Sequence, residues 1–195
     1  MIDSSKIAVV ILAAGESKRL GQPKQLLLYK KPFLLDYIID ECLKFNTENL
    51  YVVLGANEKI IQDKLSNLES TTILYHTNWK DGLSSSIAFA TAQLAPKYNS
   101  IIFVLSDQIF FDTELLYKLT KAKKETNTNI VYSQYQIGQG PPILFDNVVF
   151  EDLKKLKGDA GAKEILLSNK YSSSSIPFEK GYVDIDTSED LHYLD

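Results

Sequence analysis

The sequence predicts an open α/β domain in which helices cover both faces of a mostly parallel sheet. Before Asn129, short apolar runs such as "SIIFVL" (Ser100–Leu105) alternate with amphipathic stretches. Apolar runs without polar alternation are typical of strands that are buried on both faces. After Asn129, strands around a "GQGPP" break indicate an antiparallel C-terminal extension of the sheet.

The elements follow in order from the apolar periodicity. Strands are expected at 6–13, 50–55, 71–75 and 100–105, and helices at 33–45, 57–65, 83–94 and 112–124. Asn57 and Asp112 stand where they can cap the two helices that begin there. In the C-terminal part we expect strands at 129–135 and 143–145, short helices near 149–156 and 161–167, an "SSSS" loop at 172–175 and a last helix capped by Thr187 or Ser188.

Length, composition and charge predict one domain, residues 1–195, located in the cytoplasm. The chain is 45% hydrophobic and 24% charged, and no linker rich in Pro, Gly or Ser divides it. Its net charge of −4 provides no basic field for nucleic acid or an anionic membrane. No apolar stretch approaches the ~20 residues of a membrane span. Cys42 is the sole cysteine, which excludes an internal disulfide and fits a reducing compartment.

The stretch "VVILAAGESKRLGQPKQLL", Val9–Leu27, is a candidate anion site. A buried strand runs into a loop with two glycines, and around this loop stand Lys18, Lys24 and Arg19, the sole arginine of the chain. Loop N–H groups, a helix start, a bidentate guanidinium and a movable ammonium together suit a triphosphate. The spacing excludes the dinucleotide pattern GxGxxG and the Walker pattern GxxxxGK[ST]. The plain alternative is a glycine turn with solvated lysines.

The run "LAAGESKRLGQPKQLL" resembles the signature loop LAAGxSxRMGxxKxLL of the MobA-like nucleotidyltransferases, most of all their molybdenum cofactor cytidylyltransferase branch. Leu20 stands where that branch usually has Met or Phe. The resemblance implies an open three-layer, Rossmann-like nucleotidyltransferase fold (GT-A-like), with residues 1–128 binding the nucleoside triphosphate and residues 129–195 binding the acceptor. Further motifs match in order over nearly the whole chain: "NWKDGLSSSI" (78–87), "LSDQ" (105–108), "GQGPPILF" (138–145), "GDAGAK" (158–163) and "DIDTSEDL" (184–191).

Two aspartates are candidate metal ligands. Asp107 directly follows an apolar strand, at the carboxyl edge where open α/β sheets gather their ligands, and there it can hold Mg²⁺ or cap the next turn. Asp186 lies in "DIDTSED", which by itself indicates only a helix start. The resemblance implies that Asp107 and Asp186 hold Mg²⁺ between them, with Asp184 as the alternative if the register is shifted.

The chemistry of nucleotidyl transfer is governed by charge. A phosphate oxygen of the acceptor has to approach the crowded α-phosphate of the nucleotide and expel pyrophosphate, so the protein mainly aligns and neutralises. We expect Arg19, Lys24 and Asp107 to carry this catalysis with Mg²⁺. His76 is expected at a strand end and His192 at the surface, and neither is needed as a general base. The serines at 84–86 fit helix caps and ligand contacts better than a nucleophile.

The resemblance also implies where the base of the nucleotide lies. In this family the base sits over the first loop and the turns that follow the second and third strands. Ala14 gives the loop an LAAG sequence, whereas guanylyl-transferring relatives usually have LAGG, so CTP is favoured over GTP. The nucleotide-binding residues implied by position are Leu12, Ala13, Ala14, Gly15, Arg19, Lys24, Gly55, Asn78, Gly82 and Ser84.

The acceptor side departs from the family pattern at two places. Relatives commonly have RGHP where this chain has Gln139-Gly140-Pro141-Pro142, and they end GDxGAR where it has Lys163. The first change removes a charge and an imidazole that would face an anionic pterin. Gln139, Asp159 and Lys163 are the expected acceptor contacts, and a hairpin turn with a helix cap is the structural alternative.

These observations predict an enzyme that transfers CMP from CTP to the phosphate of molybdopterin and releases pyrophosphate. Its partners would be CTP or GTP, the molybdopterin-type acceptor and a recipient molybdoenzyme or its chaperone. Guanylyl transfer, or transfer to another phosphorylated small molecule such as a sugar phosphate, remains open because the fold would be the same. The alternative that is not an enzyme is a nucleotide-binding accessory protein without turnover. The pair of candidate metal ligands, Asp107 and Asp186, argues against it, because a protein that only binds the nucleotide does not need a metal pair at the α-phosphate.

Overall fold

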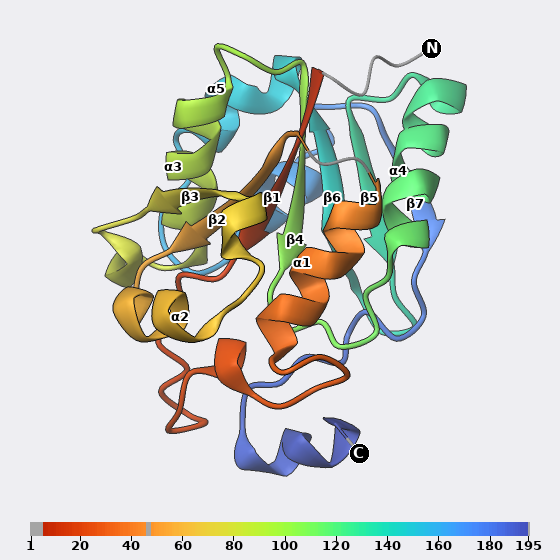
Figure 1. Cartoon of the computed structure of the whole chain (residues 1–195). Helices are drawn as coiled ribbons and strands as arrows, with labels where there is room; N and C mark the ends of the chain where they lie inside the picture. Colours follow the sequence, from red (N-terminus) through yellow and green to blue (C-terminus); the bar gives the residue numbers. More distant parts are fainter. Residues whose placement is uncertain (1–5, 46–47, 195) are drawn as a thin grey trace.

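The fold is built on one mixed sheet of seven strands, described by a computed structural model for residues 6–45 and 48–194 (Figure 1). β1 is buried along its whole length and β4 at all but its last residue, as expected for central strands of continuous apolar sequence. In spatial order the strands are β3 (Thr72–Tyr75), β2 (Leu50–Leu54), β1 (Ile7–Leu12), β4 (Ser100–Leu105), β6 (Gln139–Asp146), β5 (Ile130–Gln134) and β7 (Ser173–Pro177).

All described neighbouring strands run parallel, except at the two ladders formed by β6. β1 pairs in parallel with β2 and β4, β2 with β3, and β5 with β7. β6 runs antiparallel to both β4 and β5. The predicted mostly parallel α/β sheet is therefore confirmed, and its antiparallel extension is one reversed strand.

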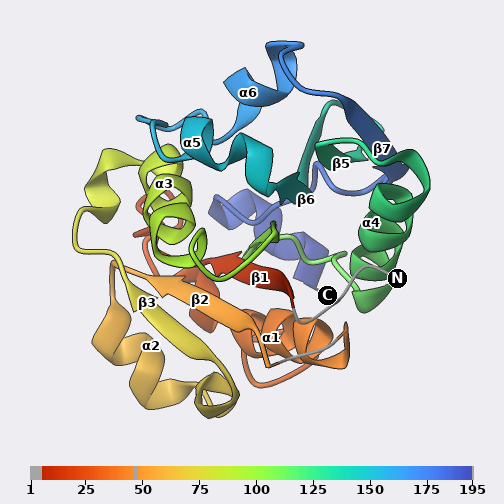
Figure 2. The ribbon, with the colours of Figure 1, turned by 90° about the horizontal axis from the view of Figure 1, so that it is seen from above.

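Helices cover both faces of the sheet, which gives three layers (Figure 2). α1 (Leu34–Phe45), α2 (Glu58–Lys64) and α4 (Thr113–Thr126) lie on one face, and α3 (Leu83–Leu94), α5 (Phe150–Leu153) and α6 (Lys163–Leu167) lie on the other. The two faces of β1 serve two apolar clusters. Val9 and Ile11 belong to the cluster that includes α1 and α4, and Ala8 and Val10 belong to the cluster that includes α3. Among the described helices, none has the length and apolar character needed to cross a membrane.

The prediction of a loop at 172–175 is wrong, because residues 173–177 form the edge strand β7. β7 pairs in parallel with β5 from the Ile130–Ser173 partners to the Gln134–Pro177 partners. Its only buried residue is Ile176. An edge strand is held mainly by backbone hydrogen bonds, so a run of exposed serines gives no apolar pattern from which the strand could be recognised.

The break predicted at "GQGPP" is also wrong in part. The turn occupies residues before Gln139, and β6 continues through both prolines to Asp146. The ladder between β5 and β6 shifts register between Val131 and Ser133, and Pro141 and Pro142 fall in this irregularity. Proline is tolerated there because the irregular stretch does not require its missing N–H group.

The helix boundaries confirm one of the two predicted caps. The Asp112 side chain accepts a hydrogen bond from the Leu115 N–H at 3.2 Å, as a cap residue does. Asn57 instead has a left-handed backbone (φ 58°) and makes no side-chain cap bond to α2. The helix predicted at 149–156 is shorter than expected, since a 3-10 turn over Asn147–Val149 leads into the single turn of α5.

Candidate active site

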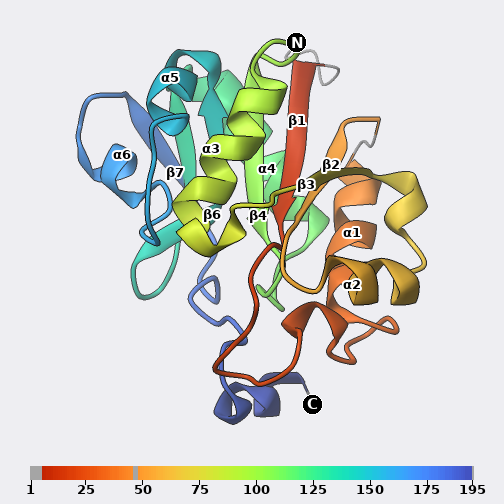
Figure 3. The same ribbon diagram turned by 90° about the vertical axis from the view of Figure 1, so that its left-hand side faces the viewer.

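The loops that follow β1 and β4 meet the segment 184–194 at the carboxyl edge of the sheet (Figure 3). Parallel strands direct their carboxyl ends to one edge, so residues far apart in sequence come together there. A pocket of about 770 Å³ lies between these segments and the start of α3. Of the predicted site residues, those that line it are Leu12, Ala14, Gly15, Arg19, Lys24, Gly82, Asp107, Asp159, Asp184 and Asp186.

The first loop is held in shape from below by Gln25. This side chain is completely buried, and its Nε2 donates to the carbonyls of Ala13 at 2.8 Å and Gly15 at 3.1 Å. Within the loop, the Ser17 carbonyl accepts from the N–H groups of Leu20 and Gly21, both at 3.1 Å. Within the described residues, the N–H groups of 15–18 find no intramolecular acceptor, which leaves them available to an anion.

The helix start that was counted among the anion donors does not lie at the loop. The loop leads into a single 3-10 turn, Lys24–Leu26, and the helix predicted at 33–45 begins at Leu34. Anion binding therefore depends on loop N–H groups and on the cationic side chains, and a helix dipole does not contribute there.

Three carboxylates form an acidic cluster at one side of the pocket. One oxygen each from Asp107, Asp184 and Asp186 lies within 4.8 Å of the other two. Asp107 is buried, and its Oδ1 has no hydrogen-bond partner among the described residues. Hard divalent cations prefer such carboxylate oxygens, and an orphaned buried oxygen calls for a cation. The residues present therefore fit a divalent metal ion.

The backbone around Asp186 is fixed by Asp190. The Asp190 carboxylate accepts hydrogen bonds from the N–H of Asp186 at 3.0 Å and from the N–H and hydroxyl of Thr187 at 2.7 and 2.9 Å. The next element is the 3-10 helix Ser188–Leu194. The predicted capping by Thr187 or Ser188 is thus reversed, since Asp190 supplies the accepting side chain.

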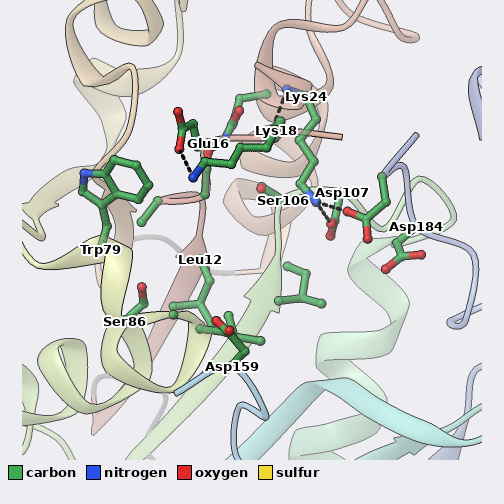
Figure 4. Close-up of a pocket in the computed structure, with 18 of the residues that line it drawn as sticks. Leu12, Glu16, Lys18, Lys24, Trp79, Ser86, Ser106, Asp107, Asp159 and Asp184 are labelled. Carbon is green, nitrogen blue, oxygen red and sulfur yellow. Dashed lines mark hydrogen bonds and ion pairs between the residues drawn. The ribbon is translucent and has the colours of Figure 1, made fainter. Parts of the chain in front are cut away.

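Two cations of the first loop reach the acidic cluster, and Figure 4 shows one of them, Lys24, next to Asp107. The Lys24 ammonium contacts Asp107 and lies 2.9 Å from Asp186 Oδ1. Arg19 Nη2 lies 2.5 Å from Asp186 Oδ2. Burial works against the charge of Lys24, but Asp107 and Asp186 outweigh it, so the pKa of Lys24 is raised and the ammonium stays charged.

The remaining carboxylate shows how crowded the negative charge is. Partial burial, reinforced by the neighbouring charges of Asp107 and Asp186, raises the pKa of Asp184 to about 6. Lys24 opposes this shift without cancelling it. Lys24 and Arg19 therefore offset only part of the repulsion among the three carboxylates, and a further cation at the cluster would reduce the remainder.

Trp79 forms the far wall of the pocket, across from the acidic cluster (Figure 4). It belongs to the 3-10 turn Trp79–Asp81 and packs directly on Gly55, where a Cβ atom would lie 2.6 Å from Trp79 Cβ. Gly82, with φ 91°, lets the start of α3 approach residue 158, since a Cβ there would lie 2.6 Å from the Gly158 carbonyl oxygen. Both glycines are needed for close approach.

Several predicted nucleotide contacts lie outside the pocket. Ala13 is buried beneath the loop, Gly55 supports Trp79 from behind, and Asn78 is exposed next to the pocket wall. Ser84 is completely buried, and its hydroxyl donates to the Gly161 carbonyl at 3.1 Å. Ser86, two residues on, lines the pocket instead.

Neither histidine lies in the pocket lining. His76 is buried, its ring stacks on Phe89 with centroids 4.7 Å apart, and its Nε2 lies 2.9 Å from Ser85 Oγ. His192 is exposed in the last 3-10 helix.

Sequence reasoning missed Gln25 and Trp79. Gln25 acts only through the loop that it supports, and no residue type marks such a role. Trp79 carried a usable signal, because it is the sole tryptophan and lies between two residues that were selected, Asn78 and Gly82.

An anion loop that faces carboxylates across the carboxyl edge of such a sheet is the arrangement of a nucleotidyltransferase. The model of the MobA-like NTP transferase domain matches residues 9–173. The chain belongs to this family, and the resemblance found in its motifs is confirmed.

Relatives match the chain over nearly its full length. It is 28% identical over 194 residues to nicotine blue oxidoreductase of Paenarthrobacter nicotinovorans, covering 95% of this chain and 94% of that protein. It is 23% identical over 187 residues to molybdenum cofactor cytidylyltransferase of Escherichia coli (strain K12), covering 96% and 94%. The likeness therefore extends over both halves of the chain.

Solved structures with the same fold include Rv0371c of Mycobacterium tuberculosis H37Rv. It matches with a TM-score of 0.86 and 28% identity over 97% of both chains. A complex of Rv0371c with manganese matches with a TM-score of 0.82 and 26% identity over 97% of both chains. Together with the acidic cluster, this neighbour supports divalent metal binding.

Proposed function

We propose that this protein transfers CMP from CTP to the phosphate of a molybdopterin-type acceptor, releases pyrophosphate and uses Mg²⁺ in the cytoplasm. The observation that carries the proposal is the meeting of Lys24 with Asp107 and Asp186 beside the first loop. A site for a triphosphate needs cations and N–H donors, and a site for transfer needs metal-binding carboxylates beside them.

In the proposed reaction, an oxygen of the acceptor phosphate forms a bond to the α-phosphorus of CTP. The bond from that phosphorus to the bridging oxygen of pyrophosphate breaks, and pyrophosphate leaves with the electron pair. The N–H groups of 15–18, with Arg19 and Lys24, neutralise the triphosphate and its leaving group. Asp107, Asp184 and Asp186 would hold Mg²⁺, which supplies further charge neutralisation at the phosphates.

The base would lie between the first loop and Trp79, which is held rigidly on Gly55. An indole ring at a pocket wall offers a face for base stacking, and such stacking is tolerant of base identity. The preference for CTP over GTP rests on Ala14, where the guanylyl-transferring relatives carry glycine.

The test is a direct assay of the purified chain with Mg²⁺ and molybdopterin. CTP should yield pyrophosphate and a cytidine dinucleotide of the pterin, detected by mass spectrometry, and GTP should yield less. Asp107→Asn should abolish the product, and Asp112→Asn, at a capping aspartate away from the pocket, serves as the matched control. Turnover with a sugar phosphate in place of molybdopterin would transfer the proposal to another acceptor, and CTP binding without turnover of any acceptor would refute the enzyme.

A second candidate comes from the relative that is named an oxidoreductase. The same preparation should therefore also be assayed for reduction of a dye by an added electron donor. The acidic cluster favours nucleotidyl transfer, because reduction of a dye does not require metal-binding carboxylates beside an anion loop.

A further inference from the structure

A second hollow adjoins the nucleotide pocket on the side of the C-terminal half. This groove, called the acceptor groove here, has a volume of about 580 Å³. Its walls come from the turn before β6, from α6 and from the segment around Gly181. Leu105 and Asp184 line both the groove and the nucleotide pocket, so the two are continuous at the acidic cluster.

Large apolar side chains project into this groove from three separate segments. Ile137 is 70% exposed, Leu167 56% and Tyr182 42%. They are three of the nine large apolar side chains that are well exposed within the described residues. Apolar groups gathered at one concave site beside a reaction centre are typical of a ligand-binding surface.

The floor of the groove is braced by a buried hydrogen-bond network. Gln108 is 1% exposed, and its Nε2 lies 3.0 Å from the Tyr135 hydroxyl, 3.0 Å from the Pro141 carbonyl and 2.8 Å from the Gly181 carbonyl. The Tyr135 hydroxyl also contacts the Pro141 carbonyl. A Cβ atom at Gly181 would lie 2.6 Å from the Phe178 ring, so the segment that presents Tyr182 is packed tightly. The groove is therefore preformed.

Polar side chains also line the groove, among them Gln139, Lys163 and Asp184. Among the described residues of the lining, Lys163 is the sole cation, and no ion pair is found for it in the described part of the chain. Gln139 adds one amide. An apolar cavity of about 160 Å³ next to the groove shares Leu105, Pro141 and Lys163 with it.

We infer that Ile137, Leu167 and Tyr182 determine acceptor specificity by packing on the apolar faces of a flat ring system. Its phosphate would lie toward the acidic cluster, where a divalent metal ion would offset the charge of Asp184, and one further anionic group would lie at Lys163. This inference rests on the proposed function and adds to it the residues that select the acceptor. The exposed apolar side chains favour a flat ring over a sugar ring that carries hydroxyl groups on its faces.

The test compares Ile137→Ser, Leu167→Ser and Tyr182→Ser with Val148→Ser. Val148 is an exposed apolar residue (54%) that lies far from the groove. It comes two residues after Asp146, which pairs with Ser100 at the start of β4, whereas Asp107 lies beyond the end of β4. Each groove variant should raise the KM for molybdopterin about tenfold while the CTP affinity stays unchanged. Val148→Ser should match the parent protein, and Tyr182→Phe should retain the parent KM because it keeps the ring. CTP affinity is read from the fluorescence of the sole tryptophan.

Binding is measured separately from turnover, by calorimetry of the CTP-loaded protein with molybdopterin and with glucose 1-phosphate. Weaker molybdopterin binding in the three groove variants supports the inference even if no pyrophosphate is released, in which case the proposed transfer alone fails. Parent-like molybdopterin binding in all three variants, or a preference of the parent protein for glucose 1-phosphate, overturns the inference and leaves nucleotidyl transfer standing.

Discussion

Lys24 holds its ammonium between two of the three carboxylates that fit a divalent cation. The position is favourable without metal, because the carboxylates would otherwise repel each other in a partly buried site. Asp107 and Asp186 would also be among the residues that hold a metal ion, so Lys24 would then have to give up at least one of these contacts. The released ammonium would then be free to reach the phosphates of the nucleotide.

Replacing Lys24 by Met should strengthen metal binding while it removes turnover. The nucleotide-free variant is expected to bind Mn²⁺ roughly tenfold more tightly than the parent protein, because no ammonium competes for Asp107 and Asp186. Pyrophosphate release should fall at least ~100-fold. Electron paramagnetic resonance of free Mn²⁺ measures the affinity. Lys18→Met removes an equal charge from the same loop at a residue paired with Glu16; the same tightening in that variant would contradict displacement.

Arg19→Lys keeps the charge but loses the planar fork. Arg19 is an exposed loop residue that pairs with Asp186, so the exchange should leave the melting temperature nearly unchanged. An ammonium lacks the planar pair of parallel N–H donors with which a guanidinium binds two phosphate oxygens, and kcat/KM for CTP should fall by about tenfold or more. Steady-state kinetics and a thermal melt on the same sample check both statements. A parent-like kcat/KM would show that Arg19 acts only as a charge.

His76 should make stability depend on pH below neutrality. Burial lowers its pKa in the folded protein, so the unfolded chain takes up the proton first, and the contribution of His76 to the free energy of unfolding decreases as the pH falls below about 6.5. The raised pKa of Asp184 acts in the opposite direction, because the folded protein takes up that proton first. Urea unfolding of the parent protein and of His76→Gln at pH 7.5 and pH 5.5 separates the two effects. The change to pH 5.5 should be more stabilising, or less destabilising, in His76→Gln, and an equal change in both proteins would contradict the role of His76.

At the residue level, the sequence predicted roles that depend on a residue's position next to a strand or loop. It missed roles that depend on contacts between residues brought together by folding. Asp107 could be found because it lies two residues after the end of a buried strand. Ser84 could not be separated from Ser86, because only the rotation of α3 decides which hydroxyl is buried against Gly161. Gln25 and Trp79 owe their roles to a loop and a glycine brought close by folding.

At the level of elements, continuous apolar runs predicted the parallel strands well. β7 escaped prediction because an edge strand needs no apolar face and its sequence is mostly serine. β6 was predicted too short because prolines are poor markers of a strand, although they fit the irregular part of its ladder.

The two predicted caps provide a matched pair for a stability measurement. Asp112→Ala should lower the free energy of unfolding by about 1 kcal/mol, because the Leu115 N–H loses its acceptor. Asn57→Gly removes no cap bond and suits the left-handed backbone, so it should not destabilise the protein. Urea unfolding compares the two variants. Equal losses in both would show that the Asp112 bond contributes little.

At the scale of the whole molecule, the acidic cluster brings together carboxylates from two distant parts of the chain, the end of β4 and the segment after Val183. A metal ion that binds only the folded protein should therefore stabilise it, by about 2.7 kcal/mol at a concentration 100 times its Kd. Mn²⁺ should raise the melting temperature of the parent protein and of Asp112→Asn alike. Asp107→Asn should lose this shift, and a shift of parent size in that variant would place the metal elsewhere.

The reversed strand β6 has a mechanical consequence. It joins β4 by hydrogen-bonded pairing from Ser100–Asp146 to Phe103–Ile143, and β5 lies on its other side. The sheet therefore continues without a break from the strands that carry the first loop to the strands beside the acceptor groove. A hinge movement between these two parts would have to break the hydrogen bonds between β4 and β6. Substrate binding would then depend on movements of side chains, and the Lys24 ammonium, which lies between the two carboxylates, is the side chain expected to move toward the phosphates.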